Sequence, residues 1–267
     1  MEITLADKVA VITGGARGIG LTIARLFAES GAVVIIADIN AEGGLKAATA
    51  LAELGYKCEY KKIDLSDTEN FDVFVSDIVS KYKRVDILVN NARAGEKFGL
   101  LDENFMNWNL TINVILASSF FLSQCMIKVM AQVKSGTILN ISSVAGILAT
   151  PESPSYHAAK GGMIALTKYL STEAGAYGVR VNSILPGFVV QDQHIEFFRS
   201  PENYRYRQIV ETYQPGGNVG TEKDIAEAAL FLCSDSAKYI SGASLVIDGG
   251  ATVQEQSGLS FKISKLQ

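Results

Sequence analysis

The sequence predicts an α/β protein: a doubly wound parallel sheet of about seven strands, with helices on both faces, in a single domain. Short runs of β-branched and other apolar residues alternate with longer segments whose apolar residues recur every 3.6 residues. Most short runs are apolar throughout, which is typical of strands buried on both faces of a parallel sheet. No break in composition and no internal repeat divides the chain, so we expect one domain over residues 1–267.

Seven of the short runs are interpreted as strands. They lie, in chain order, at residues 8–13, 33–38, 56–63, 85–90, 136–142, 179–185 and 244–248. The third run is the weakest prediction, because it carries several charges. The clearest periodic segments predict helices at residues 19–30, 70–82 and 158–175, and Ser30-Gly31 is a typical helix end.

Two segments fall outside this alternation. Residues 187–219 are rich in charge and aromatic rings, with Pro-Gly at both ends, so we expect an insertion with short helices at most. Long insertions in compact domains are often lids or binding loops, which makes this segment the expected substrate loop. The tail at 251–267 is longer than the fold needs, and we expect it to pack across a subunit interface or to help close a neighbour's site.

Composition excludes several classes of function. The net charge of −4 comes without a block of Lys and Arg, so we expect no nucleic-acid partner. Two histidines and three unpaired cysteines (Cys58, Cys125 and Cys233) predict neither a metal site nor a disulfide set. The cysteines fit a reducing compartment, and the first residues lack the pattern of a signal peptide. We therefore expect a cytoplasmic protein.

The uncharged run at 104–127 is long enough to span a bilayer. Its Asn, Thr, Ser and Gln residues lie on every face of a helix, however, and lipid would leave these polar groups without partners. We interpret it as a helix buried within the protein, and expect no membrane association.

A glycine-rich turn, T-G-G-A-R-G-I-G, joins the first predicted strand to the first helix. Gly14, Gly18 and Gly20 allow a tight turn that brings backbone N–H groups to a pyrophosphate at the helix N-terminus. Asp38 ends the second strand, where a carboxylate can accept hydrogen bonds from the adenosine ribose. The carboxylate would repel a 2′-phosphate, whereas Arg17 would attract one. We expect NAD rather than NADP, the other interpretation being a plain turn with a surface Asp.

Tyr156 and Lys160 lie one helical turn apart, on the same face of a predicted helix. A tyrosine with an ordinary pKa near ~10 is a poor base at neutral pH, and a nearby ammonium group lowers that value. Ser143 ends the fifth strand, at the sheet edge where ligands of such folds bind. Ser143 could therefore hold a reacting oxygen while Tyr156 moves its proton; the alternative is a solvated helix face. No G-x-S-x-G motif supports a serine hydrolase, and His157 has no evident partner.

From Ala6 to Gly250 the chain resembles the classical short-chain dehydrogenase/reductases. The motifs that carry the resemblance stand in the expected order: the glycine turn, Asp64, N90-N-A92, I141-S-S143, Y156-H-A-A-K160, P186-G187 and V246-I-D-G-G250. The resemblance implies a Rossmann-type NAD-binding domain. It also implies hydride transfer at the nicotinamide, with Tyr156 as acid/base and Ser143 orienting the substrate. Homotetramers or homodimers are implied, often built with the helices around residues 105–130 and 156–175.

The resemblance carries specific roles onto this chain. Lys160 would bind the nicotinamide ribose and lower the tyrosine pKa, Asp64 would meet the adenine, and Asn90 would line the cofactor cleft. The expected cofactor-binding residues are Gly14, Arg17, Gly18, Ile19, Gly20, Asp38, Asp64, Leu65, Asn90, Ala92, Tyr156, Lys160, Pro186, Gly187, Val189 and Gln191. The expected substrate-binding residues are Arg93, Ser143, Ala145, Tyr156 and Phe188.

The sequence departs from the family pattern at three positions. N-N-A-G reads N-N-A-R, which places the Arg93 guanidinium near the nicotinamide mouth. Gln191 replaces a threonine that usually helps to hold the cofactor. Ile115 occupies the position of the asparagine that completes the family's catalytic tetrad. Asn113 is no substitute, because two residues along a helix rotate a side chain by about 200°; we expect it to cap a helix or to bond elsewhere in the core.

Three functions remain open. The first is an active NAD(H)-linked oxidoreductase acting on a secondary alcohol or ketone of a small, polar substrate, such as a sugar derivative or hydroxy acid. The second is a dinucleotide-binding protein with weakened or lost catalysis, suggested by Ile115 and Arg93. The third is an epimerase or dehydratase on the same scaffold, which the glycine pattern disfavours. Substrate identity, physiological direction and the route of the proton without the tetrad asparagine are not encoded in any pattern that we recognise.

Overall fold

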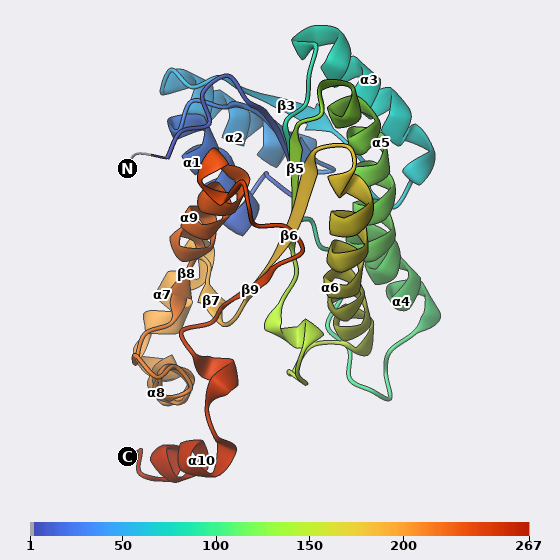
Figure 1. Ribbon diagram of the computed structural model, residues 1–267. Coiled ribbons are helices and arrows are strands. Elements are labelled where there is room, and N and C mark those ends of the chain that lie inside the picture. The colour runs from blue at the N-terminus through green and yellow to red at the C-terminus, as the bar shows by residue number, and fades with distance from the viewer. Residues whose placement is uncertain (1–2, 267) are drawn as a thin grey trace.

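The computed structural model describes residues 3–266 and contains a seven-stranded, all-parallel sheet (Figure 1). The strand order is β3-β2-β1-β4-β5-β6-β9. β2 and β3 are added outward on one side of β1 and the later strands on its other side, so the strand order reverses between β1 and β4. The strands are β1 (Val9–Thr13), β2 (Val33–Asp38), β3 (Cys58–Lys62), β4 (Ile87–Asn90), β5 (Gly136–Ile141), β6 (Val179–Pro186) and β9 (Ser244–Ile247). All seven predicted strands and the doubly wound class are confirmed.

Helices cover both faces of the sheet, because successive strand side chains point to opposite sides. From β1, Ala10 and Ile12 enter one core and Val9 and Val11 enter the other. The first core is completed by α1 (Gly18–Glu29), α2 (Ala41–Glu53) and α9 (Glu222–Cys233). The second is completed by α3 (Phe71–Tyr82), α5 (Ser118–Val133) and α6 (Pro154–Gly175). Figure 1 shows these two helical layers on either side of the strands.

The uncharged run forms one long helical column of the second layer. It comprises α4 (Phe105–Ile112), a π-helical turn over Asn113–Ala117, and α5. By length and composition this 29-residue column, Phe105–Val133, could cross a membrane, but half of its most apolar window is buried inside the protein. Contacts with α3 and α6 account for this burial, as expected for a core helix.

The 187–219 insertion holds short helices, as predicted, and one pairing that was not predicted. Its helices are α7 (Ile195–Arg199) and α8 (Tyr204–Thr212). β7 (Val189–Val190) pairs in parallel with β8 (Gly220–Thr221), which closes the insertion at its base. The chain ends in α10 (Gln256–Ser264), which lies beside α8 and away from the main body in Figure 1.

Candidate active site

The glycine turn is shaped by positive φ angles and close backbone contact. Gly14 and Gly18 have φ of 64° and 61°, a region that side chains disfavour. A Cβ at Gly20 would lie only 2.2 Å from the Gly14 carbonyl oxygen. Asn91 supports the turn by donating from Nδ2 to the carbonyl oxygens of Thr13 (3.0 Å) and Gly14 (3.1 Å). No role was predicted for Asn91, although it lies within the N-N-A motif.

The start of α1 fits the pyrophosphate of a dinucleotide. The first N–H groups of a helix have no partner within the helix, and the N-cap residue, Arg17, makes no side-chain capping bond to them. These donors, together with the positive end of the helix dipole, favour an anion at this place. The amide of Gln191 closes over the turn, since a Cβ at Gly18 would be 3.2 Å from its Oε1. Ile19, another of the residues predicted to bind the cofactor, lies in the first turn of α1.

Asp38 is fixed beside this turn at the end of β2. Its Oδ2 accepts from the Ala16 amide at 3.1 Å and its Oδ1 from the Asn40 amide at 3.0 Å. The Tyr60 hydroxyl donates to the Asp38 backbone carbonyl at 3.0 Å. A carboxylate held in this way presents negative charge next to the glycine turn, where an adenosine ribose would lie.

The remaining predicted cofactor residues divide into cleft and core positions. Asp64 is exposed and its Oδ1 accepts from Ser66, whereas Leu65 is buried. Ala92 lies against Gly14. Asn90 instead points into the core, donating from Nδ2 to Asn140 Oδ1 at 2.9 Å. The expectation that its side chain lines the cleft is therefore wrong, because these buried bonds hold neighbouring strands together.

Pro186 and Gly187 carry the chain from β6 over the cleft. Gly187 packs against Asp248, where a Cβ would come within 2.5 Å, and Val189 belongs to the small β7–β8 pair. The Phe188 ring packs against Phe198 and Tyr206 of the insertion at 6.1 and 6.4 Å between centroids. Part of Phe188 stays exposed, so it can still offer a surface to a substrate.

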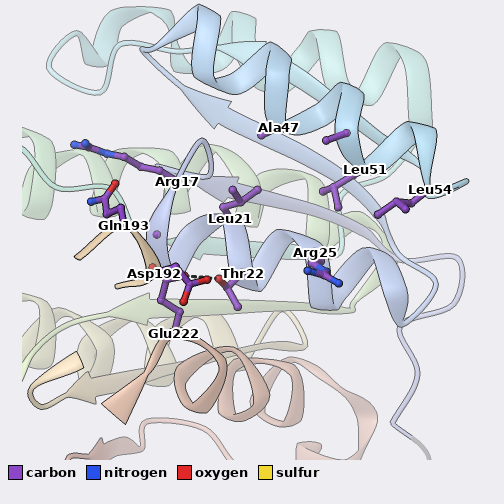
Figure 2. A pocket seen from close by; sticks show the side chains of 12 residues that line it. Arg17, Leu21, Thr22, Arg25, Ala47, Leu51, Leu54, Asp192, Gln193 and Glu222 are labelled. Atoms are coloured by element: carbon purple, nitrogen blue, oxygen red, sulfur yellow. Dashed lines mark hydrogen bonds between the residues drawn. The ribbon is translucent and has the colours of Figure 1, made fainter. Parts of the chain in front are cut away.

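A hollow of about 460 Å³ lies beside this region, but away from the catalytic residues. Figure 2 shows its walls, formed by α1, α2 and the start of the insertion, with Thr22 bonded to Glu222 across its lower side. It shares Arg17 and Gly18 with the glycine turn and contains none of Ser143, Tyr156 or Lys160. Those three residues lie instead at the carboxyl edge of the sheet, where ligands of such folds are expected to bind.

The three predicted catalytic residues meet at that edge. Ser143 follows β5, and its Oγ accepts from the Ala145 amide at 3.1 Å, which leaves its own proton free to donate. Tyr156 lies in the first turn of α6, whose N-cap, Ser153, accepts from the Tyr156 amide. Ala145, expected to line the substrate, is almost completely buried and offers little surface.

Lys160 is buried in α6, with its ammonium 5.5 Å from the centre of the Tyr156 ring. Its Nζ donates to the Ile141 carbonyl at 2.6 Å and lies 3.8 Å from the Met163 sulfur. Burial, and to a smaller extent the charge of Arg93, lowers the pKa of Lys160 to about 7. The lysine is therefore poised between its charged and neutral forms near neutral pH.

The pKa of Tyr156 is raised from its ordinary value. Burial is the largest cause and Glu152 adds to it, while the positive charge of Arg93 and a hydrogen bond with Ser143 act in the opposite direction. Arg93 lies directly over the ring, with its Cζ 5.1 Å from the ring centre. The substitution of Arg for the family's glycine thus places a cation at the catalytic tyrosine.

Ile115 lies in an apolar cluster near the catalytic residues predicted from the sequence. It is buried within the π-helical turn and packs in one cluster with Ala159 and Met163, with Tyr156 at its margin. Asn113 is exposed, which corrects the expectation that it bonds within the core. It stands at the C-cap position of α4, where the π-helical turn begins.

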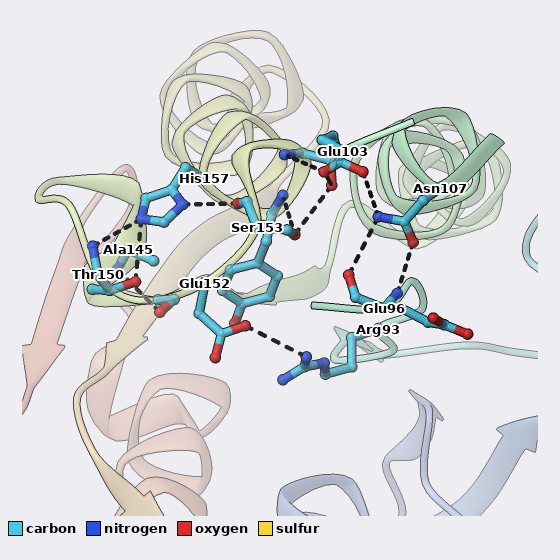
Figure 3. A network of polar contacts seen from close by, with 12 residues as sticks. Arg93, Glu96, Glu103, Asn107, Ala145, Thr150, Glu152, Ser153 and His157 are labelled. Carbon is cyan, nitrogen blue, oxygen red and sulfur yellow. Dashed lines mark hydrogen bonds and ion pairs between the residues drawn. The ribbon is translucent and has the colours of Figure 1, made fainter. Parts of the chain in front are cut away.

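A chain of polar contacts surrounds Tyr156 and links both sides of the cleft (Figure 3). Arg93 Nη2 lies 3.8 Å from Glu152 Oε2. His157, for which the sequence showed no partner, accepts at Nε2 from the Thr150 amide (2.9 Å) and contacts the Ser153 carbonyl through Nδ1. The juxtaposition of Arg93 and Glu152, which are far apart in the sequence, had no signal in any local pattern.

Comparison with known proteins finds matches over nearly the whole chain. A family model described as "Enoyl-(Acyl carrier protein) reductase" matches residues 14–252. The chain is 38% identical to the 3-oxoacyl-[acyl-carrier-protein] reductase FabG of Chlamydia trachomatis serovar D, over 92% of this chain and 98% of that protein. It is 33% identical to D-threitol dehydrogenase of Mycolicibacterium smegmatis, over 95% and 96% of the two chains. The crystal structure of gox2181 superposes with a TM-score of 0.86 at 30% identity, covering 94% of this chain and 98% of that one.

Proposed function

The chain belongs to the classical short-chain dehydrogenase/reductase family, and on that premise we propose that it is an NAD(H)-dependent oxidoreductase. It moves a hydride between the nicotinamide and a secondary alcohol or ketone of a small, polar substrate. The observation that carries the proposal is the meeting of Tyr156 with Ser143 and Lys160 at the sheet edge, next to a glycine turn built for a pyrophosphate.

Each residue near the reacting oxygen has a separate role in binding that oxygen or in transferring its proton. A bound dinucleotide supplies or accepts the hydride. Ser143 donates to the substrate oxygen, since its Oγ already accepts from Ala145. Tyr156 then takes the proton of an alcohol during oxidation, or returns it to the oxygen of a ketone during reduction. Lys160 and Arg93 stabilise the phenolate that Tyr156 must pass through.

Asp38 supports NAD as the cofactor. Its carboxylate is held by two backbone amides, so it cannot easily turn away from a 2′-phosphate. Arg17 is exposed and therefore mobile enough to remain in solvent. Fluorescence titration with NADH and NADPH tests this choice: tighter binding of NADH supports it, whereas tighter binding of NADPH contradicts it.

A second substrate class is favoured by one observation, the 38% identity with a 3-oxoacyl-[acyl-carrier-protein] reductase. The D-threitol dehydrogenase relative supports a small polyol or polar alcohol instead. A panel of NADH-linked assays distinguishes the two: small polar ketones and a short 3-oxoacyl thioester are offered under the same conditions. A clear preference for the thioester would move the proposal to acyl reduction.

Weakened catalysis is the second candidate function, and Ile115 favours it. Isoleucine carries no group that relays a proton, and it packs instead in one cluster with Met163, whose sulfur lies 3.8 Å from Lys160 Nζ. An Ile115→Asn variant decides between the candidates when NADH turnover is compared with wild type. A gain of about tenfold or more would indicate an impaired site. A change of less than about twofold would show that the proton travels by another route.

Self-association is part of the proposal, as a homotetramer or homodimer. The column α4–α5 and the neighbouring α6 expose large apolar side chains, among them Phe105 (79% exposed), Met106 (82%) and Tyr169 (58%). Apolar surface of this kind favours burial against a second copy. Light scattering at several concentrations tests it, and a stable monomer would contradict it.

A further inference from the structure

Two opposite charges face each other over Tyr156, one from each side of the cleft. Arg93 comes from the loop after β4 and Glu152 from the loop before α6. The guanidinium is 3.8 Å from the carboxylate and 5.1 Å from the centre of the tyrosine ring. Figure 3 shows Arg93 and Glu152 pointing toward one another, joined by a dashed line.

The contact between Arg93 and Glu152 is weak enough for another anion to take the place of Glu152. The side chains of Arg93 and Glu152 are 56% and 30% exposed, and their separation is at the long end for an ion pair. Exposed pairs of this kind contribute little to stability. An anion that reaches Arg93 with two short hydrogen bonds would therefore displace Glu152 at small cost.

The loop that carries Arg93 is held firmly. Asn107 accepts from the Glu96 amide at 2.7 Å and donates to Glu103 Oε1 at 2.7 Å. The other oxygen of Glu103 accepts from the Ser155 hydroxyl at 2.6 Å, which ties this loop to α6. Gly95 has a φ of 93° and packs so closely on α4 that a Cβ would lie 2.1 Å from Thr111 Oγ1.

The loop that carries Glu152 is held by hydrogen bonds to His157, a residue of α6. Thr150 donates from its amide to His157 Nε2 at 2.9 Å, and Nδ1 of that ring lies 2.9 Å from the Ser153 carbonyl. Ser153 caps α6. Both loops are thus anchored on the helix that carries Tyr156, so the two charges keep a fixed relation to the reacting hydroxyl.

We propose that Arg93 is the anchor for the carboxylate of a short hydroxy acid or oxo acid, and that Glu152 is the counter-ion it exchanges for that carboxylate. The planar guanidinium matches a carboxylate with two parallel hydrogen bonds. The guanidinium carbon lies over the Tyr156 ring, 5.1 Å from its centre. At this short range we expect a carboxylate held by Arg93 to leave the second or third carbon of the substrate near the tyrosine hydroxyl. The substrate class is therefore a 2- or 3-hydroxy acid and its oxo acid. This inference rests on the proposed oxidoreductase function and narrows its substrate.

The test compares pairs of ketones that differ only in charge. Acetoacetate is paired with acetoacetamide, and pyruvate with pyruvamide, as NADH-dependent substrates. The measured quantity is the ratio of kcat/KM for the acid to that for its amide. The ratio cancels any effect of Arg93 on Tyr156 that both substrates share.

Wild type should prefer the acid in at least one pair. Arg93→Gln should lower the ratio by about tenfold or more, as expected for the loss of a charged hydrogen-bond partner. Glu152→Gln should raise it, because the competing carboxylate is gone. Lys97→Gln is the matched control: it removes one positive charge from an exposed position on the same loop and should leave the ratio unchanged.

An equal ratio in wild type and Arg93→Gln, or a wild-type preference for both amides, would overturn the inference. Lack of turnover with all four ketones would count against the oxidoreductase function instead. In that case thermal shift with NADH and each acid decides about Arg93. A shift by an acid in wild type that is lost in Arg93→Gln and kept in Lys97→Gln supports the anchor, and the lack of such a shift contradicts it.

Discussion

The charge around Tyr156 is arranged differently from what a Tyr-Lys pair alone would suggest. Arg93 and Lys160 lie at similar distances from the ring, 5.1 and 5.5 Å from its centre. Lys160 is buried among apolar side chains, and burial lowers its pKa to about 7. Arg93 places a planar, delocalised guanidinium over the same ring. The residue that departs from the family pattern thus adds a second cationic group next to Tyr156.

Exchange of Arg93 should move the pH dependence of alcohol oxidation. The charges that face Tyr156 are those of Arg93, Lys160 and Glu152, and Arg93 lowers the tyrosine pKa while Glu152 raises it. Oxidation needs the phenolate, so its rate rises with pH through that pKa. Arg93→Gln should shift the rising limb to higher pH and Glu152→Gln to lower pH, in kcat measured with saturating substrate. Shifts in the same direction, or none, would contradict this account.

Burial of Lys160 should also make the free energy of unfolding depend on pH. Its pKa is about 7 in the folded state and 10.5 in the unfolded chain, so the unfolded state binds more protons between these values. Stability therefore rises as pH increases from 7 to 10.5, and the cost of burying the ammonium is complete below pH 7. Without cofactor, Lys160→Met should be more stable than wild type near pH 7 by on the order of a few kcal/mol.

Denaturant unfolding at several pH values measures this difference. Groups far from Lys160 contribute equally to both proteins and cancel in the comparison. The advantage of Lys160→Met should shrink steadily as pH approaches 10.5. A difference that stays constant over that range would show that the buried amine does not titrate as described.

Among the elements, strands were easier to predict than helices. The five central strands of the sheet follow from apolar runs, because burial on both faces leaves few polar residues in them. The edge strand β3 is only partly buried and carries several charges, so its prediction was the weakest. α2 was not placed, since Gly43 and Gly44 weaken its helical pattern. The π-helical turn and the β7–β8 pair have no signal in local sequence, because both arise from packing with distant segments.

Gly44 illustrates how tertiary contact overrides helix propensity. Alanine is the better helix former, but a Cβ at Gly44 would lie 2.2 Å from the Tyr60 ring. Gly44→Ala should therefore destabilise the protein by about 1–3 kcal/mol, through displacement of the ring or the helix. Gly175→Ala is the control, because no atom lies within 4 Å of its Cβ position. Denaturant midpoints that fall equally, or not at all, for both variants would contradict the argument.

For the whole molecule, the sequence predicts the fold and the position of the catalytic residues more fully than it predicts their surroundings. Ser143, Tyr156 and Lys160 were identified by spacing and by place on the sheet, and the structure brings them together. Asn90 was assigned to the cleft but lies in the core, because local spacing does not show which way a strand-end side chain turns. The Arg93–Glu152 pair forms only when two loops fold against α6.

The most direct test of the account is the rate of NADH oxidation by wild type and Tyr156→Phe with the ketone panel, measured alongside NADH affinity. Tyr156 supplies the proton in every catalytic step described above. Tyr156→Phe should lower turnover by about 10²–10⁴-fold, the usual contribution of a general acid or base, while NADH still binds. Wild-type turnover by Tyr156→Phe, or tight NADH binding by wild type without turnover of any ketone, would contradict the account.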